Sequence, residues 1–127
     1  MVSVDPEDVA VFIHESVVRG YHIYKETWTP SVGEVLLVQQ EPENPHDRRA
    51  VCILKSSTIV GHVPRELSRV FWFFISHGGT ISCEITGHRK RGKGLEVPCL
   101  YKFTGSERMI TKMKGILRVK NCHSHYG

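Results

Sequence analysis

The sequence of 127 residues lacks several patterns that mark large classes of proteins. It has no apolar run near the roughly 18 residues that a membrane-spanning helix needs. Its N-terminus has neither the basic segment nor the small-residue cleavage site of a signal peptide. No internal repeat or low-complexity segment interrupts the chain. We therefore expect one intracellular domain with no membrane partner.

Paired cysteines are also missing. The chain contains four cysteines, Cys52, Cys83, Cys99 and Cys122. None belongs to a CxxC pair, and the first three fall in apolar runs where a reduced thiol packs as a small hydrophobic group. Cys122, His123 and His125 lie close together in sequence, but their spacing fits no common zinc module. We predict reduced structural thiols, no bound metal and no other cofactor.

Catalytic motifs are absent as well. The sequence contains no HExxH, no GxSxG and no P-loop, because "GHRKRGKG" at residues 87–94 lacks the GxxxxGK[ST] order. The carboxylates concentrate before residue 48, but their spacing does not suggest a cage for Mg²⁺. We predict a protein that is not an enzyme, so any ATPase or helicase activity would lie outside this chain.

Short alternating apolar runs predict a mainly β fold. We expect strands over residues 11–19, 34–40, 50–55, 58–63, 80–89 and 95–103. Pro98 favours an edge or a bulge for the last strand. Apolar residues at helical spacing predict helices over residues 64–79 and 107–117. The pattern indicates an α+β protein with a small, closed or nearly closed barrel of about six strands and two flanking helices. Residues 1–10 would form an extension, 11–118 the domain and 119–127 a flexible tail.

The charge is divided unevenly along the chain. Residues 1–47 carry two basic and nine acidic side chains, whereas residues 48–127 carry fifteen basic and four acidic ones. An excess of cations favours a phosphate-rich partner. The 87–94 segment also gathers cations between two strands, with glycines that let a backbone approach phosphate closely. Upstream, "GYHIYKETW" offers His22, Tyr24 and Trp28 as rings on which bases could stack.

Three segments together resemble the HIRAN domain family. The chain has Gly20 and Tyr24 in a Gly-aromatic segment, then "EPENPHDRRA" at 41–50 and "VGHVPREL" at 60–67. These match the family's "EP-NP-D--A" and "VGH-P-EL" elements, and the resemblance runs from about Val11 to Leu117. It implies a monomeric, OB-like or SH3-like β-barrel with helices at its side.

The resemblance also implies a site. A family member in a SNF2-type helicase captures the 3′ end of single-stranded DNA. Carried over by position, Asp47 would accept a hydrogen bond from the terminal hydroxyl, and Asn44 would shape the turn. His46 would stack on a base and His62 would meet phosphate or sugar. The basic segment, His88, Arg89, Lys90, Arg91 and Lys93, would lie near the exiting strand.

One position departs from the family pattern. The family member has an Arg-Tyr pair in the first-strand loop, where this chain has His22 and Ile23 followed by Tyr24. Neutral histidine binds phosphate less well than arginine. The departure favours binding of single-stranded or generic DNA over strict selectivity for a 3′-hydroxyl.

Two functions are therefore predicted. The first is a module that binds single-stranded DNA or DNA ends in repair or replication-fork processing, in the nucleus and within a larger multidomain protein. The alternative is a peptide-binding module of SH3-like type that does not bind nucleic acid. It would use Tyr21, Tyr24 and Trp28 as an aromatic groove, so exposure of these rings distinguishes the two.

Overall fold

The computed structural model describes residues 9–88 and 96–126, without the side chains of His22 and of residues 119–126. The expected N-terminal extension up to residue 8 and residues 89–95 of the basic segment lie outside this description. The strands are β1 (Val9–Val18), β2 (Val35–Gln40), β3 (Val51–Lys55), β4 (Thr58–His62), β5 (Thr80–Ile85) and β6 (Val97–Ser106). The helices are α1 (Tyr21–Tyr24), α2 (Arg65–Ser76) and α3 (Glu107–Tyr126).

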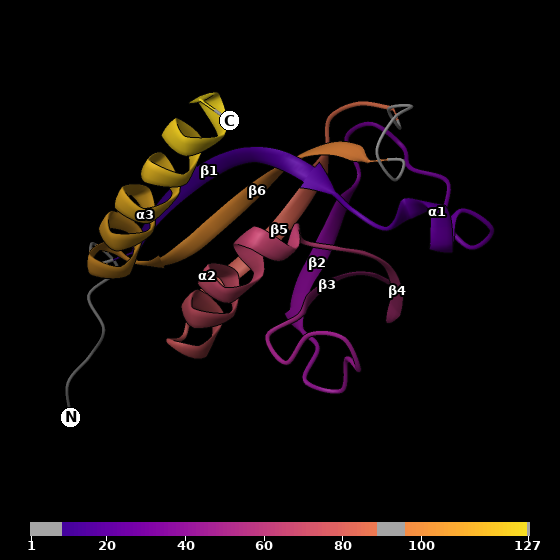
Figure 1. Ribbon diagram of the computed structural model, residues 1–127, viewed down its shortest axis with the longest axis horizontal. Coiled ribbons are helices and arrows are strands. Elements are labelled where there is room, and N and C mark those ends of the chain that lie inside the picture. The colour runs from indigo at the N-terminus through magenta and orange to yellow at the C-terminus, as the bar shows by residue number, and fades with distance from the viewer. Residues whose placement is uncertain (1–8, 89–95, 127) are drawn as a thin grey trace.

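The strands form one antiparallel sheet that nearly closes on itself. Its order is β1-β6-β5-β2-β3-β4. The two outer strands meet where Arg19 and His62 exchange two backbone hydrogen bonds of 2.9 Å. In Figure 1, α2 lies across β5, and α3 lies beside β1 and β6. This arrangement confirms the predicted mainly β barrel of six strands with two flanking helices.

Aromatic packing fixes α2 on the sheet. Phe71 and Phe74 of α2 are fully buried against Tyr101 and Phe103 of β6. Phe71 meets the two β6 rings edge to face, with centroids 5.0 and 4.9 Å apart. Such pairs add about 0.5–1.5 kcal/mol each beyond the burial of their area. The packing also determines where the first turn of α2 lies relative to the other strands.

Local signals give the ends of several elements correctly. Pro64 precedes α2, and Gly78 after it has a φ of 88°, so the helix ends where glycine was expected to end it. Ser56 and Ser57 both have positive φ, 49° and 70°, as a two-residue turn of type I′ requires. The predicted hairpin between β3 and β4 is confirmed.

Pro98 does not mark an edge strand. It belongs to β6, which lies between β1 and β5, and it faces Val17 of β1. The register of β5 with β6 ends at Ile85 and Cys99, so Pro98 comes one residue beyond the ladder on that side. There its carbonyl accepts a hydrogen bond of 3.1 Å from the Thr86 amide. The missing N–H of proline thus falls where β5 has already ended.

The C-terminal helix is longer than predicted. We expected it to end near Leu117, but α3 continues to Tyr126 and includes residues 119–126, which we had assigned to a flexible tail. Residues 118–126 contain neither proline nor glycine. The chain therefore offers no strong helix-ending signal after Leu117. No helix in the described part of the chain combines the length and the apolar character needed to cross a membrane.

His14 predicts a pH dependence of stability. Its side chain, only 5% exposed, points from β1 into the core. Burial lowers the pKa of His14, and the neighbouring Glu15 opposes this less strongly. As pH falls below the ordinary value of about 6.5, the unfolded chain takes up a proton that the folded one refuses. Stability should therefore fall with pH, by at most about 1.4 kcal/mol per pH unit from this group, until the folded pKa is passed.

Urea unfolding at pH 7.5, 6.5 and 5.5 measures this effect. The His14→Gln variant should show a flatter pH dependence than the unchanged protein, whatever its absolute stability. Equal slopes for the protein and its His14→Gln variant would contradict the prediction.

Candidate nucleic-acid interface

The loop between β2 and β3 is built by its own side chains. Asn44 Oδ1 accepts hydrogen bonds from the backbone amides of His46 and Asp47, at 2.8 and 2.9 Å. Asp47 Oδ1 accepts one from the amide of Arg49 at 2.9 Å. Short Asn and Asp side chains commonly bond to the backbone two or three residues ahead. The two motif residues therefore hold consecutive turns of one loop.

Asp47 also joins this loop to α2. Its Oδ2 lies 3.2 Å from the Ser68 hydroxyl, whose single proton it shares with the Arg65 carbonyl oxygen at 2.9 Å, and Ser68 is buried. Arg65 lies one turn earlier on the same helix face, and its Nη2 is 3.5 Å from the His46 carbonyl oxygen. A carboxylate has about four acceptor positions. Within the described residues, two of them are occupied at Asp47, so the group retains acceptor capacity.

Glu41 organises the opposite wall. Its Oε1 lies 2.6 Å from Nε2 of His62 and accepts a hydrogen bond of 3.2 Å from the Asn44 side chain. The Tyr24 ring is tilted by 44° against the His62 ring, with 6.1 Å between centroids. Burial, then Glu41 and Cys52, raises the pKa of Tyr24. Tyr24 therefore keeps its phenolic proton at neutral pH and can donate or accept a hydrogen bond.

These groups surround a surface cavity of about 460 Å³. Its lining comes from α1, the β2–β3 loop, β3, the end of β4 and α2, and comprises Ile23, Tyr24, Glu41, Asn44, Pro45, His46, Asp47, Ala50, Val51, His62, Val63, Arg65 and Ser68. The volume falls within the range of ligand pockets, about 300–1,000 Å³. Five of the predicted site residues, Tyr24, Asn44, His46, Asp47 and His62, thus share one cavity.

The described part of the chain places one further predicted site residue, His88. His88 is exposed three residues after β5 and is not among the lining residues. Arg89, Lys90, Arg91 and Lys93 lie outside the described residues, as does the side chain of His22. The side chains of Cys122, His123 and His125 are also outside them. Among the described residues, no three His, Cys, Asp or Glu side chains come together as a metal site.

Trp28 and Tyr21 are not surface rings. Trp28 is 3% exposed and Tyr21 6% exposed, and the two rings pack edge to face with centroids 5.8 Å apart. The Trp28 amide bonds to the Tyr24 carbonyl, which turns the chain back, and its indole N–H donates to Glu34 at 2.6 Å. The prediction that Trp28 stacks on bases is wrong. Two of the three rings of the peptide-groove alternative are core residues.

The predicted thiols are buried and reduced. Cys52, Cys83 and Cys99 are free and inaccessible. Burial, reinforced by Glu41, raises the pKa of Cys52 to about 11. Because the thiolate is the reactive form of cysteine, the Cys52 thiol is unreactive at neutral pH.

Eight lining residues were not predicted as site residues, and four of them shape the surface or the polar contacts of the cavity. Glu41 belonged to the matched motif, but its contact to His62 depends on the pairing of β2, β3 and β4. Ile23 is 67% exposed and gives the rim an apolar surface. The remaining two, Arg65 and Ser68, are three residues apart on α2, a spacing that places them on one face.

Comparisons with known proteins agree with the fold. The HIRAN domain model matches residues 11–106. The crystal structure of the HIRAN domain of human HLTF has a TM-score of 0.72 at 20% identity, over 90% of this chain and 93% of that one. The NMR structure of the HLTF domain in its DNA-bound conformation has a TM-score of 0.67 at 21% identity, over 88% and 91%.

A bacterial structure is similar as well. A protein from Lactobacillus plantarum has a TM-score of 0.55 at 18% identity, over 74% of this chain and 97% of that one. A comparison with curated proteins finds no significant match. The family model covers most of the sequence, from the third residue of β1 to the last residue of β6. The chain belongs to the HIRAN domain family.

Proposed function

We propose that the chain is a DNA-binding module that captures the end of a single strand in the cavity beside the β2–β3 loop. The observation that carries this proposal is the convergence of Tyr24, Asn44, His46, Asp47 and His62 on one cavity of about 460 Å³. The similarity to the HLTF domain in its DNA-bound conformation supports it.

Asp47 would recognise the terminal hydroxyl. Its carboxylate retains acceptor capacity beyond its bonds to Arg49 and Ser68. A 3′-hydroxyl donates a hydrogen bond to a carboxylate, whereas a 3′-phosphate brings negative charge beside it. A charge-assisted hydrogen bond contributes about 1.5–3 kcal/mol. A free hydroxyl end should therefore bind more tightly than a phosphorylated one.

The rings and the rim would hold the last nucleotides. Tyr24 is half-buried, and His46 is exposed on the loop, so each ring offers a surface to a base. Stacking of a base on an aromatic ring contributes about 1–3 kcal/mol. His62 uses Nε2 toward Glu41, which leaves Nδ1 to accept a hydrogen bond from a sugar hydroxyl in the neutral ring, or to donate one to a phosphate oxygen in the protonated ring. The chain would in this way grip an end without base-specific contacts.

Fluorescence anisotropy with 5′-labelled single strands tests the proposal. Strands of one sequence should carry either a 3′-hydroxyl or a 3′-phosphate, and an unlabelled circular single strand serves as competitor without ends. We expect at least tenfold tighter binding of the hydroxyl end and weak competition by the circle. Equal binding of both ends would rule out end capture, and absence of binding to either at moderate salt would rule out the DNA-binding function.

The wider role follows from the same proposal. A module that holds a strand end would position a larger, nuclear protein on intermediates of DNA repair or at stalled replication forks. The described residues supply binding groups for this task. Strand remodelling would be carried out by domains outside this chain.

A further inference from the structure

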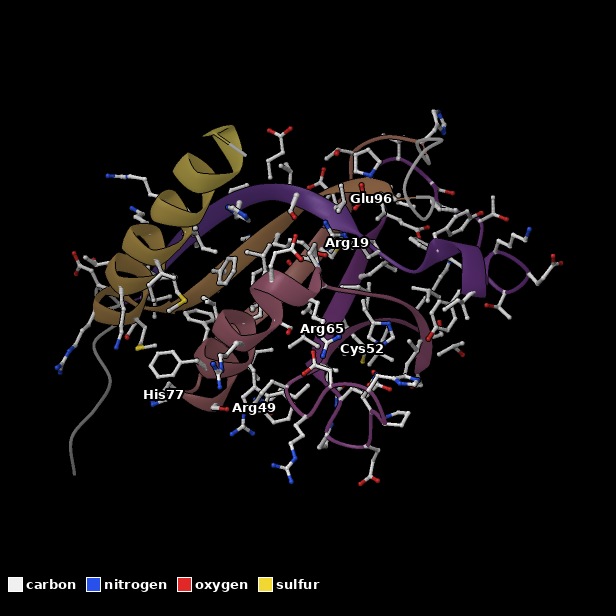
Figure 2. All side chains as sticks on the ribbon, in the orientation of Figure 1. Arg19, Arg49, Cys52, Arg65, His77 and Glu96 are labelled. Atoms are coloured by element: carbon white, nitrogen blue, oxygen red, sulfur yellow. The ribbon has the colours of Figure 1, made fainter. Side chains whose placement is uncertain are left out.

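A second cavity adjoins the first on the side of α2. It measures about 610 Å³ and is lined by His46, Asp47, Arg48, Arg49, Arg65, Ser68 and Arg69. The first cavity, beside the β2–β3 loop, is called the end cavity below. Four residues line both cavities: His46, Asp47, Arg65 and Ser68. The two hollows therefore adjoin, with the Asp47–Ser68 contact in the wall of both. Figure 2 shows Arg49 projecting beside α2 and Arg65 closer to the barrel.

The four arginines of this cavity outnumber the one carboxylate in its lining, that of Asp47. Arg48, Arg49, Arg65 and Arg69 are all exposed, and within the described residues none forms an ion pair; those pairs involve Arg19, Lys55 and His62 instead. Arg49 lies over the Trp72 ring, 5.4 Å from its centroid, which orders the side chain without neutralising it. Four guanidinium groups around one hollow leave a concentrated positive potential that a polyanion would balance.

A second route by which a strand could leave the end cavity, past Arg19, differs in charge from the arginine side. Arg19 bonds to Glu66 at 2.6 Å and to Glu96 at 2.7 Å. Glu96 precedes β6, at the base of the basic segment, and Figure 2 shows it beside Arg19. Within the described residues, one guanidinium is thus shared between two carboxylates, so this network offers a phosphate no uncompensated cation. A phosphate chain leaving the end cavity is attracted to the arginines and not to this network.

We propose that the arginine cavity, formed by Arg48, Arg49, Arg65 and Arg69, binds the phosphodiester backbone of the nucleotides that lead to the captured end. This assignment rests on the DNA-end binding proposed above and adds the path of the strand. The strand runs from the end cavity past His46 and along the exposed side of α2. Guanidinium groups suit this contact because they bind phosphate oxygens in pairs. Such contacts carry no base preference.

Strand length separates the two cavities in the unchanged protein. A 5′-labelled dinucleotide with a 3′-hydroxyl reaches the end cavity, whereas an octanucleotide also reaches the arginines. We expect the octanucleotide to bind at least tenfold more tightly. The plot of log affinity against log salt should be steeper for the octanucleotide by about 2, since each phosphate contact of a single strand contributes about 0.7.

Substitution tests the same assignment. The variant Arg48→Gln, Arg49→Gln, Arg69→Gln keeps Arg65, which lines both cavities. Its octanucleotide affinity should fall at least tenfold, and its dinucleotide affinity by less than twofold. A control with equal charge loss on β6 and α3 uses Lys102→Gln, Arg108→Gln and Lys114→Gln, all exposed. This control should bind both strands nearly as the unchanged protein does.

Four results would overturn the assignment. Equal affinity and equal salt slope for the two lengths in the unchanged protein would show that the arginines do not touch the strand, with end capture intact. The same affinity loss in the control variant would reduce the effect to net charge. An equal loss of affinity for the dinucleotide and the octanucleotide in the arginine variant would mean that the substitutions disturb the end cavity or the fold. If neither strand binds the unchanged protein, the proposed function fails, and the strand path with it.

Discussion

Replacing Gly61 by alanine is expected to lower the free energy of unfolding by about 3 kcal/mol. An alanine Cβ at this position would stand 2.4 Å from Cγ1 of Val18 and 3.0 Å from the carbonyl oxygen of Arg19. Val18 is fully buried, and the Arg19 carbonyl accepts the hydrogen bond by which His62 closes the barrel. Neither atom can withdraw without disturbing the core or the closure. Urea unfolding followed by tryptophan fluorescence measures the loss.

Two further variants test the cause. Gly115→Ala makes the same change in α3, where an added Cβ meets no atom within 4 Å. It should raise stability by about 0.5–1 kcal/mol, because alanine favours helix over glycine. Adding Val18→Ala to Gly61→Ala should cost less than the sum of the two single changes, since the shorter side chain relieves the closer contact. A Gly61→Ala protein as stable as the unchanged one would refute the close approach.

The close approach gives the "VGH" segment a physical meaning. β4 reaches the end of β1 only because position 61 has no side chain on the Val18 side. The next residue, His62, is held by this closure, and its ring therefore points at Glu41 in the end cavity. The matched motif thus couples a condition of the fold to the placement of a site residue.

The loop residues of the site were predictable because their interactions are local. Asn44 bonds to amides two and three residues ahead, and Asp47 to one two residues ahead. Such bonds follow from residue type and order alone. The membership of Asn44 and Asp47 in one turn could therefore be predicted without knowledge of the tertiary structure.

The arginine cavity could not be predicted in this way. Arg48 and Arg49 marked only the point where the charge of the chain changes sign. Arg65 and Arg69 belong to α2, whose position depends on Phe71 packing against β6. Contacts between residues about twenty positions apart arise from that packing, which residue order does not specify. The sequence therefore directed attention to the cations of the 87–94 segment.

Trp28 shows that the position of an aromatic ring, too, could not be predicted from the sequence. A cluster of aromatics indicates neither core nor surface, because both environments favour them. The turn after α1 decides the outcome. The Thr27 and Trp28 amides bond back to Tyr24, so Trp28 enters the core while Tyr24 stays at the cavity. A difference of four residues thus separates a ring in the core from a ring in the lining of the cavity.

Asp47 has a structural role in its loop and a proposed binding role, and the two can be separated by substitution. Ser68→Ala removes the bond to Oδ2 without changing the charge at residue 47. It should lower stability by about 1 kcal/mol and preserve the preference for a hydroxyl end. Asp47→Ala removes the side-chain bonds to the Arg49 amide and to the Ser68 hydroxyl, and it should lower stability by about 2 kcal/mol. Its effect on DNA binding therefore mixes the two roles.

Asp47→Asn separates them most sharply. The asparagine Oδ1 can still accept the Arg49 amide, and its NH₂ group can donate to the Ser68 hydroxyl, so the loop should keep its shape. The carboxylate that receives the terminal hydroxyl is lost, and affinity for a 3′-hydroxyl strand should fall about 30-fold, equivalent to about 2 kcal/mol. A 3′-phosphate strand loses a repulsion and should bind a few-fold more tightly. Anisotropy titrations with the two strands should therefore show the preference removed or reversed at unchanged stability, whereas an undiminished preference would leave Asp47 with its loop role alone.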